Sequence, residues 1–290
     1  MSAKVAFIIN PKAGVKKKMD VPAFIEEHFS KSIPKEIIVW KNKDDFESIR
    51  QYVLSGGFTI VVAVGGDGTV NQVAAALNNT SIALGILPFG SGNGLARSIG
   101  VSMDIKEALK QIERGKTNRI DSGTINNIPF FCTSGIGFDA HIGNLFATNT
   151  KRGFSSYFKI IRKELFSYKP KTYELNIDGK IIKREAFLIT FANAGQYGNN
   201  FYIAPLADMR DGILHISVVK PFSLLLAPSL AYKAFRKKIH FSRYVETFEG
   251  KEISIKITEP SPIHFDGEPT EVKEDIAVKI QGNTLSVVVP

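Results

Sequence analysis

Cysteine is nearly absent from this chain of 290 residues, with Cys132 as its single example. One cysteine cannot form an intrachain disulfide, and it cannot supply the several thiolates of a cysteine-rich zinc site. The chain also lacks a run of about 18 uninterrupted apolar residues, the minimum for a membrane-spanning helix. Its N-terminus runs directly into a strand-like stretch, without the apolar segment and cleavage site of a signal peptide. We therefore expect a cytoplasmic protein that folds without disulfides.

The remaining composition is ordinary for a globular protein, with 44% apolar and 22% charged residues. At about 150 residues per domain, the length corresponds to two domains or to one large α/β unit. Lys and Arg number 37 against 28 Asp and Glu, which gives a formal charge of +9. Such an excess attracts nucleic acid, anionic lipid and polyphosphate alike, so by itself it selects no partner.

Strand and helix patterns alternate in the first part of the chain. Strands are predicted at 5–9, 37–40, 59–64 and 82–87, and helices at 44–54, 70–77 and 93–98. Short apolar strands that alternate with helices indicate a parallel sheet covered on both faces. We predict an N-terminal Rossmann-like α/β domain over residues 1–124.

The pattern changes after about residue 124. Asp178-Gly179 and Gly282-Asn283 each separate two strand candidates, and both pairs predict a β-hairpin. The remaining predicted elements are strands at 186–192, 213–219 and 253–257 and helices at 158–166 and 224–235. We predict a mostly antiparallel β-sandwich domain over residues 125–290.

A glycine-rich loop, Gly65-Gly66-Asp67-Gly68-Thr69, separates a predicted strand from a predicted helix. Ligands of open α/β sheets bind at the carboxyl ends of the strands, and the free N–H groups at a helix start suit an anion. Because a bare carboxylate repels phosphate, Asp67 fits such a site if Mg²⁺ bridges it or if it orients a loop. The alternative is a turn in which Asp67 caps the helix.

Two further loops of small and polar residues follow predicted strands, one at 10–14 and one at 88–94. Three such loops at corresponding strand ends predict a phosphate-binding site for a nucleotide. No lysine follows the glycines as in a P-loop, and the third glycine of a dinucleotide-binding motif is replaced by Asn71 or Leu95.

These motifs resemble those of the diacylglycerol kinase and sphingosine kinase superfamily of lipid kinases. Residues 10–14, 65–71 and 88–96 are similar to its first three motifs, and 135–139, 208–214 and 266–268 follow in the family's order. The resemblance implies an N-terminal ATP-binding domain, a C-terminal β-rich lipid domain and a site between them. The pair Gly94-Leu95 departs from the bacterial diacylglycerol kinase pattern, which leaves the acceptor lipid open.

The resemblance also implies roles for single residues. The implied ATP-site residues are Asn10, Pro11, Lys12, Ala13, Gly14, Gly65, Gly66, Asp67, Gly68, Thr69, Asn71, Ser91 and Asn93. The implied Mg²⁺ ligands are Asp208, Asp211 and Ile213, and the implied catalytic residues are Asp67, Asp266 and Glu268, with Glu268 as the general base. Asp139 corresponds to an acid that contacts the lipid headgroup.

From the residues alone, each acidic position has another interpretation. Asp211-Gly212 and Asp266-Gly267 are typical of turns, and Asp139 is compatible with a solvated loop. The five histidines show no metal-binding spacing and are interpreted as structural or surface residues; they are His28, His141, His215, His240 and His264.

Two basic blocks stand out in the predicted lipid domain. Residues 233–243 carry five cations and no acid next to the apolar stretch 222–235, and residues 151–184 carry ten basic and three acidic residues. An apolar stretch bordered by cations suits a membrane interface, although a core helix with a solvated end fits as well. Acids concentrate at 245–275, where nine face three lysines.

The combined prediction is an ATP- and Mg²⁺-dependent kinase for the hydroxyl of diacylglycerol, a sphingoid base or ceramide. Its expected partners are a membrane-derived lipid and an anionic membrane surface to which it binds peripherally, with no nucleic acid; a homodimer is left open. The alternatives are a kinase for a soluble substrate such as NAD or a sugar phosphate, and an inactive lipid-binding protein.

Overall fold

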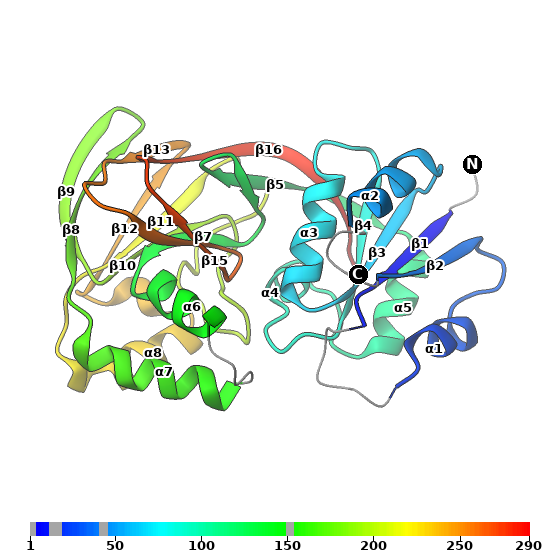
Figure 1. Cartoon of the computed structure of the whole chain (residues 1–290), viewed down its shortest axis with the longest axis horizontal. Helices are drawn as coiled ribbons and strands as arrows, with labels where there is room; N and C mark the ends of the chain where they lie inside the picture. The colour runs from blue at the N-terminus through cyan, green and yellow to red at the C-terminus, as the bar shows by residue number, and fades with distance from the viewer. Residues whose placement is uncertain (1–3, 12–18, 41–45, 149–153) are drawn as a thin grey trace. The chain divides into compact units, whose positions relative to one another are not determined.

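The computed structural model describes residues 4–11, 19–40, 46–148 and 154–290. The chain divides into two compact units (Figure 1). Unit 1 holds residues 1–121 and 283–290, and unit 2 holds residues 122–282. None of the described helices is long and apolar enough to cross a membrane.

Unit 1 is built on a parallel sheet with the strand order β2-β1-β3-β4. Its elements are β1 (Val5–Ile9), α1 (Val21–His28), β2 (Lys35–Val39), α2 (Phe46–Ser55), β3 (Ile60–Gly65), α3 (Asp67–Leu77), β4 (Ala83–Pro88), α4 (Gly94–Ser98) and α5 (Ile105–Arg114). Each of the first three crossovers contains a helix, as parallel pairing requires. The predicted parallel α/β domain is confirmed.

The core of unit 1 lies on the three inner strands. Every residue of β1, β3 and β4 is buried, as expected for strands covered on both faces. Helices α1 and α5 were missing from the prediction, although both begin at an aspartate that caps the first turn. Asp104 accepts a hydrogen bond from the backbone N–H of Glu107 at 3.0 Å, and Asp20 does the same for Ala23 at 3.1 Å.

Unit 2 is a β-sandwich with a helical layer. Its elements are β5 (Thr117–Ile125, which begins in unit 1), β6 (Ile128–Phe130), β7 (Thr133–Gly137), α6 (Phe138–Thr148), α7 (Phe154–Ser167), β8 (Lys171–Ile177), β9 (Lys180–Ala186), β10 (Leu188–Ala192), β11 (Leu214–Val219), η2 (Leu224–Leu226), α8 (Ala227–Phe235), η3 (Ile239–Phe241), β12 (Val245–Gly250), β13 (Glu252–Ile255), β14 (Ser261–Phe265), β15 (Glu268–Val272) and β16 (Ile276–Val288, which ends in unit 1). The six strands β12-β11-β10-β7-β14-β15 form an antiparallel sheet.

The sandwich core fills the space between this sheet and the antiparallel strands β16-β13-β8-β9. Phe191, Ile216 and Ile263 from the first sheet cluster with Leu175 and Ile255 from the second, and all five are buried. The other face of the six-stranded sheet packs against helices α6, α7 and α8, which Figure 1 shows side by side below it. The predicted antiparallel sandwich is confirmed, and α6 is a helix that the prediction lacked.

The two predicted hairpins have different outcomes. Asp178-Gly179 forms the two-residue turn between β8 and β9, with φ of 47° and 87°. The hairpin at Gly282-Asn283 is wrong, because β16 continues through this pair. Asn283 has φ of 56°, and its N–H donates to Asp121 Oδ1 at 2.7 Å, so the strand changes direction here without ending.

The division of the chain also differs from the expected boundaries at one end. We expected residues 125–290 in the second domain, but residues 283–290 belong to unit 1. The reason is strand pairing, since Ser286 and Val287 of β16 lie beside Ala83 and Leu84 of β4 in parallel register. A hydrophobic alternation indicates a strand but not which sheet it joins.

Candidate functional site

The predicted nucleotide loops of unit 1 lie at one edge of its sheet. Strands β1, β3 and β4 are parallel neighbours, so their carboxyl ends meet there. Asn10, directly after β1, donates from Nδ2 to Thr69 Oγ1 at 3.0 Å, which joins the first loop to α3. Pro11 is exposed, and Lys12, Ala13 and Gly14 lie outside the described residues.

Asp67 joins the second loop to the third. Its carboxylate accepts two backbone hydrogen bonds, from the N–H of Asn93 at 3.0 Å and from the N–H of Gly94 at 2.7 Å. Because these N–H groups begin α4, the carboxylate also stabilises the positive end of that helix. This geometry supports the loop-orienting role for Asp67, one of the alternatives raised by the sequence.

The second and third loops approach each other so closely that only glycine fits between them. A Cβ atom on Gly90 would lie 2.7 Å from the Cα of Gly66, and a Cβ on Gly92 would lie 2.8 Å from Asp67 Oδ2. Asn93 turns the third loop with φ of 49°, and its Oδ1 accepts from the Gly90 N–H at 3.0 Å. The glycines therefore serve the contact between the loops as well as any ligand.

The first turn of α3 is a candidate anion site of unit 1. Its N-cap, Gly66, has no side chain, and no described side chain caps the turn. The first N–H groups of a helix have no partner within the helix, so they can bind phosphate oxygens. Gly65 and Thr69 are buried here, Gly66 and Gly68 are half-buried, and further along Asn71 is buried and Ser91 is exposed.

In unit 2, Asp139 is the centre of a buried polar cluster. It is the second residue of α6, which directly follows β7, and its side chain is only 13% exposed. Its Oδ2 accepts from the Tyr197 hydroxyl at 2.7 Å and lies 3.0 Å from Nε2 of His264. Tyr197 also hydrogen-bonds Thr190. The interpretation of Asp139 as a solvated loop acid is therefore wrong.

His264 and Tyr197 are site residues that the sequence analysis missed. His264 lies on β14, and its Nδ1 has no hydrogen-bond partner among the described residues. Its Nε2 faces a carboxylate oxygen, which can only accept, so we assign the donated proton to Nε2. Burial raises the pKa of Tyr173 to about 12 and also raises the pKa of Tyr168, so both phenols near Asp139 keep their protons even in mildly alkaline solution. Because Tyr197, His264 and the backbone N–H of Ala140 hydrogen-bond the Asp139 carboxylate, it is held in place and could accept a further hydrogen bond from a hydroxyl or ammonium group.

Asp266 lies in the tight turn between β14 and β15, Glu268 directly follows this turn, and the two carboxylates have different surroundings. Asp266 and Gly267 form the two-residue turn between β14 and β15, with φ of 48° and 84°. The Asp266 carboxylate accepts from three backbone N–H groups, those of Phe131, Cys132 and Thr133, at 2.7–3.0 Å. Glu268 begins β15 and is exposed. Asp266 therefore holds the turn, and Glu268 is the carboxylate that is open to a substrate.

The predicted Mg²⁺ ligands of unit 2 have protein partners instead. Asp208 forms an ion pair with Arg210, with Oδ1 and Nε 3.2 Å apart. Asp211 Oδ1 accepts from the Ile213 N–H at 2.9 Å, which closes an Asx turn, and Asp211 Oδ2 lies 3.6 Å from His215 Nε2. No cluster of three His, Cys, Asp or Glu side chains suited to a metal occurs in the described part of the chain. These residues do not fit a built magnesium site, and the metal role stays a prediction.

The variant Asp211→Ala distinguishes a structural role of Asp211 in the turn from a role in binding magnesium. Asp211→Ala removes the acceptor of the Asx turn, and we expect it to lower the free energy of unfolding by about 1 kcal/mol. We expect the same loss in melting temperature with magnesium and with EDTA. Magnesium that stabilises the wild type but not the variant would show instead that Asp211 binds the metal.

Comparison with known proteins agrees with this architecture. Residues 4–125 match the diacylglycerol kinase catalytic domain, and residues 133–289 match the YegS C-terminal NAD kinase beta sandwich-like domain. A probable lipid kinase YegS-like of Cronobacter sakazakii is 30% identical over 80% of this chain and 78% of its own. The diacylglycerol kinase of Bacillus subtilis is 27% identical over 73% of this chain and 71% of its own.

A solved structure has the same fold. The putative diacylglycerol kinase from Bacillus anthracis superimposes with a TM-score of 0.80 at 21% identity, over 99% of this chain and 95% of its own. The two chains thus share a fold in which a parallel α/β unit is followed by a β-sandwich. The chain belongs to the family of diacylglycerol kinases and YegS-like lipid kinases.

Proposed function

We propose that the chain is an ATP- and Mg²⁺-dependent lipid kinase that phosphorylates a hydroxyl of diacylglycerol or of a related lipid. The observation that carries this proposal is the set of three loops joined around the uncapped first turn of α3. Such a turn suits the phosphates of a nucleotide, since backbone N–H groups and the helix dipole both favour negative charge. Family membership adds the lipid as acceptor.

In the proposed nucleotide half-site, the main role of the protein is to bind and orient the phosphates of ATP. Asp67 and Asn93 fix the loops, and the backbone N–H groups of the first α3 turn bind the phosphates. A Mg²⁺ ion bound together with ATP would supply neutralisation of the charge on the transferred phosphoryl group. We assign no residue of this chain as its ligand.

In the proposed acceptor half-site, two carboxylates have different tasks. Asp139, oriented by Tyr197 and His264, hydrogen-bonds a polar headgroup atom. Glu268 accepts the proton of the hydroxyl that attacks the γ-phosphorus, because it is the exposed carboxylate beside the turn. Asp266 keeps the turn in place and takes no part in proton transfer.

A substrate panel tests the proposal. The wild type is incubated with γ-labelled ATP and, in separate reactions, with diacylglycerol, a sphingoid base, ceramide, NAD and a sugar phosphate. We expect label on one of the three lipids. Label on NAD or on the sugar phosphate would replace the proposal with a soluble-substrate kinase, and lipid binding without turnover would indicate an inactive lipid-binding protein.

A variant of the loop contact tests the nucleotide half-site. Asp67→Ala leaves two N–H groups of α4 without their acceptor and separates the second loop from the third. We expect ATP affinity to fall at least about tenfold, since a loss of roughly 1.4 kcal/mol corresponds to this factor. Titration calorimetry with ATP measures it, and Asp104→Ala, at the cap of α5, is the matched control. An unchanged affinity would contradict the assigned role.

A further inference from the structure

The segment from Leu225 to Tyr244 of unit 2, which we name the α8 surface, exposes an unusual amount of apolar area. Four of the ten large apolar side chains that are exposed in the described part of the chain belong to it. Leu225 is 91% exposed, Phe241 74%, Tyr232 65% and Phe235 54%. Single exposed apolar residues are normal, but a gathering of this kind marks an interaction site.

The inner side of the α8 surface packs into the core of unit 2. Leu230 and Ala234 on the inner face of α8 are buried, and so is Ile239 of η3. Tyr232 and Phe235 lie on the outer face of the same helix. The exposed apolar side chains therefore belong to a segment whose opposite side is already packed into the core.

Positive charge surrounds these apolar side chains. Five cations, Lys233, Arg236, Lys237, Lys238 and Arg243, lie within eleven residues, and no acidic residue occurs between 212 and 245. None of the five has an ion-pair partner among the described residues, whereas nearby Lys220 pairs with Glu246 at 3.1 Å. Lys237 lies over the ring of Tyr202 and Arg243 over that of Tyr244, which leaves the exposed Arg236 and Lys238 open to an external anion.

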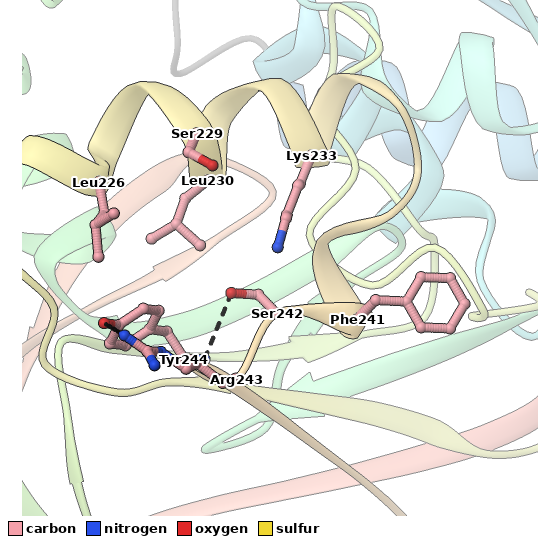
Figure 2. A pocket seen from close by; sticks show the side chains of 8 residues that line it. All are labelled: Leu226, Ser229, Leu230, Lys233, Phe241, Ser242, Arg243 and Tyr244. Carbon is pink, nitrogen blue, oxygen red and sulfur yellow. Dashed lines mark hydrogen bonds between the residues drawn. The ribbon is translucent and has the colours of Figure 1, made fainter.

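A cavity of about 350 Å³ lies between α8 and the segment after η3. Figure 2 shows Leu226, Leu230 and Lys233 pointing from the helix toward Ser242 and Tyr244 on the facing segment. The lining combines apolar side chains, the hydroxyl groups of Ser229, Ser242 and Tyr244, and the cations Lys233 and Arg243. Ammonium, guanidinium and hydroxyl donors next to apolar walls match a phosphodiester headgroup with its first acyl carbons.

We propose that the α8 surface docks the protein onto an anionic phospholipid bilayer, with Leu225 and Phe241 in the interface and a lipid headgroup in the cavity. This inference rests on the proposed function, since it names the surface that brings such a kinase to its substrate. Exposed apolar side chains together with unpaired cations favour a bilayer. The cations alone would also suit a nucleic acid, but the gathering of exposed apolar side chains favours a bilayer, and a second copy would bring like charges together.

Vesicle binding tests the docking surface. The full chain is floated with vesicles of phosphatidylcholine alone and of phosphatidylcholine with phosphatidylglycerol. We expect binding only to the anionic vesicles, weakening as salt is added. Arg236→Gln/Lys238→Gln should reduce the partition coefficient about tenfold or more, since each cation near the surface contributes several-fold. Leu225→Ser/Phe241→Ser should reduce it to a similar degree.

Matched controls come from exposed positions of the same unit that lie outside both basic blocks. Lys256→Gln/Lys273→Gln removes the same charge, and Leu206→Ser removes an apolar side chain that is 58% exposed. We expect both to bind vesicles as the wild type does. Equal losses in the control and in Arg236→Gln/Lys238→Gln would overturn the proposal, because net charge alone would then explain binding. If Leu225→Ser/Phe241→Ser fails to fold, the charge pair decides.

Other occupants give other results. A dimer in solution that Leu225→Ser/Phe241→Ser dissociates, without vesicle binding, would assign the surface to a second copy. Binding of duplex DNA in place of vesicles would assign it to nucleic acid. Either result rejects the docking proposal. Phosphorylation of a short-chain, dispersed lipid separates the docking proposal from the proposed kinase function. The docking variants should still phosphorylate this lipid, because it needs no membrane. A wild-type chain that binds vesicles but has no kinase activity would reject only the proposed function.

Discussion

Glu268→Gln is expected to lower kcat for lipid phosphorylation by about 10²–10⁴-fold, the range typical of a lost general base. Glutamine keeps the size of the side chain and its exposed position at the start of β15, but it cannot accept the hydroxyl proton. The KM for ATP and the melting temperature should stay near the wild-type values. Initial rates with labelled ATP and lipid in mixed micelles measure the effect.

Glu271→Gln provides the matched control for this variant. Glu271 is exposed on the same short strand, three residues further along. Its replacement should leave kcat unchanged. Equal rates for Glu268→Gln and the wild type would show that another group takes the proton, or that positioning alone carries the reaction.

In contrast to Glu268→Gln, Asp266→Ala should have its main effect on the stability of the fold. The substitution leaves the backbone N–H groups of Phe131, Cys132 and Thr133 without their acceptor. An unsatisfied buried donor costs about 1–3 kcal/mol, so we expect a loss of roughly 3 kcal/mol in the free energy of unfolding. Urea denaturation followed by circular dichroism measures this loss.

Asp266→Asn separates the carboxylate from the shape of the turn. Asparagine tolerates the positive φ of 48° and keeps one oxygen for the N–H groups of Cys132 and Thr133. We expect a smaller loss, about 1 kcal/mol, and an activity per folded molecule near that of the wild type. An Asp266→Asn protein that is stable but inactive would give Asp266 the catalytic role and contradict our assignment.

The gathering of the three loops at one edge of the unit 1 sheet could be predicted from the sequence because its parts are local. Each loop follows a continuous apolar strand, and parallel strands bring their carboxyl ends to one edge. The contact between Asp67 and the N–H groups of residues 93 and 94 is a different matter. Asp67 lies 26 residues before Asn93 and 27 before Gly94 in the sequence. From the sequence alone, Asp67 could therefore either cap its own helix or orient another loop.

The acceptor half-site depends on contacts that no local pattern contains. Asp139 and His264 are separated by 125 residues and meet because β14 pairs with β7. Similarly, Asp266 accepts hydrogen bonds from residues more than 130 positions earlier in the chain. Strands β7, β14 and β15 were not among the predicted strands, and the order of strands within the sheet decides which side chains meet. The wrong hairpin at Gly282-Asn283 has the same origin.

The proposed function depends most directly on one rate, the transfer of the γ-phosphate from labelled ATP to diacylglycerol or a related lipid in mixed micelles. We predict a labelled lipid product from the wild type, a rate lower by about 10²–10⁴-fold for Glu268→Gln, and an unchanged rate for Glu271→Gln. A folded wild-type protein that binds ATP and labels no lipid in the panel would contradict the assignment as a lipid kinase.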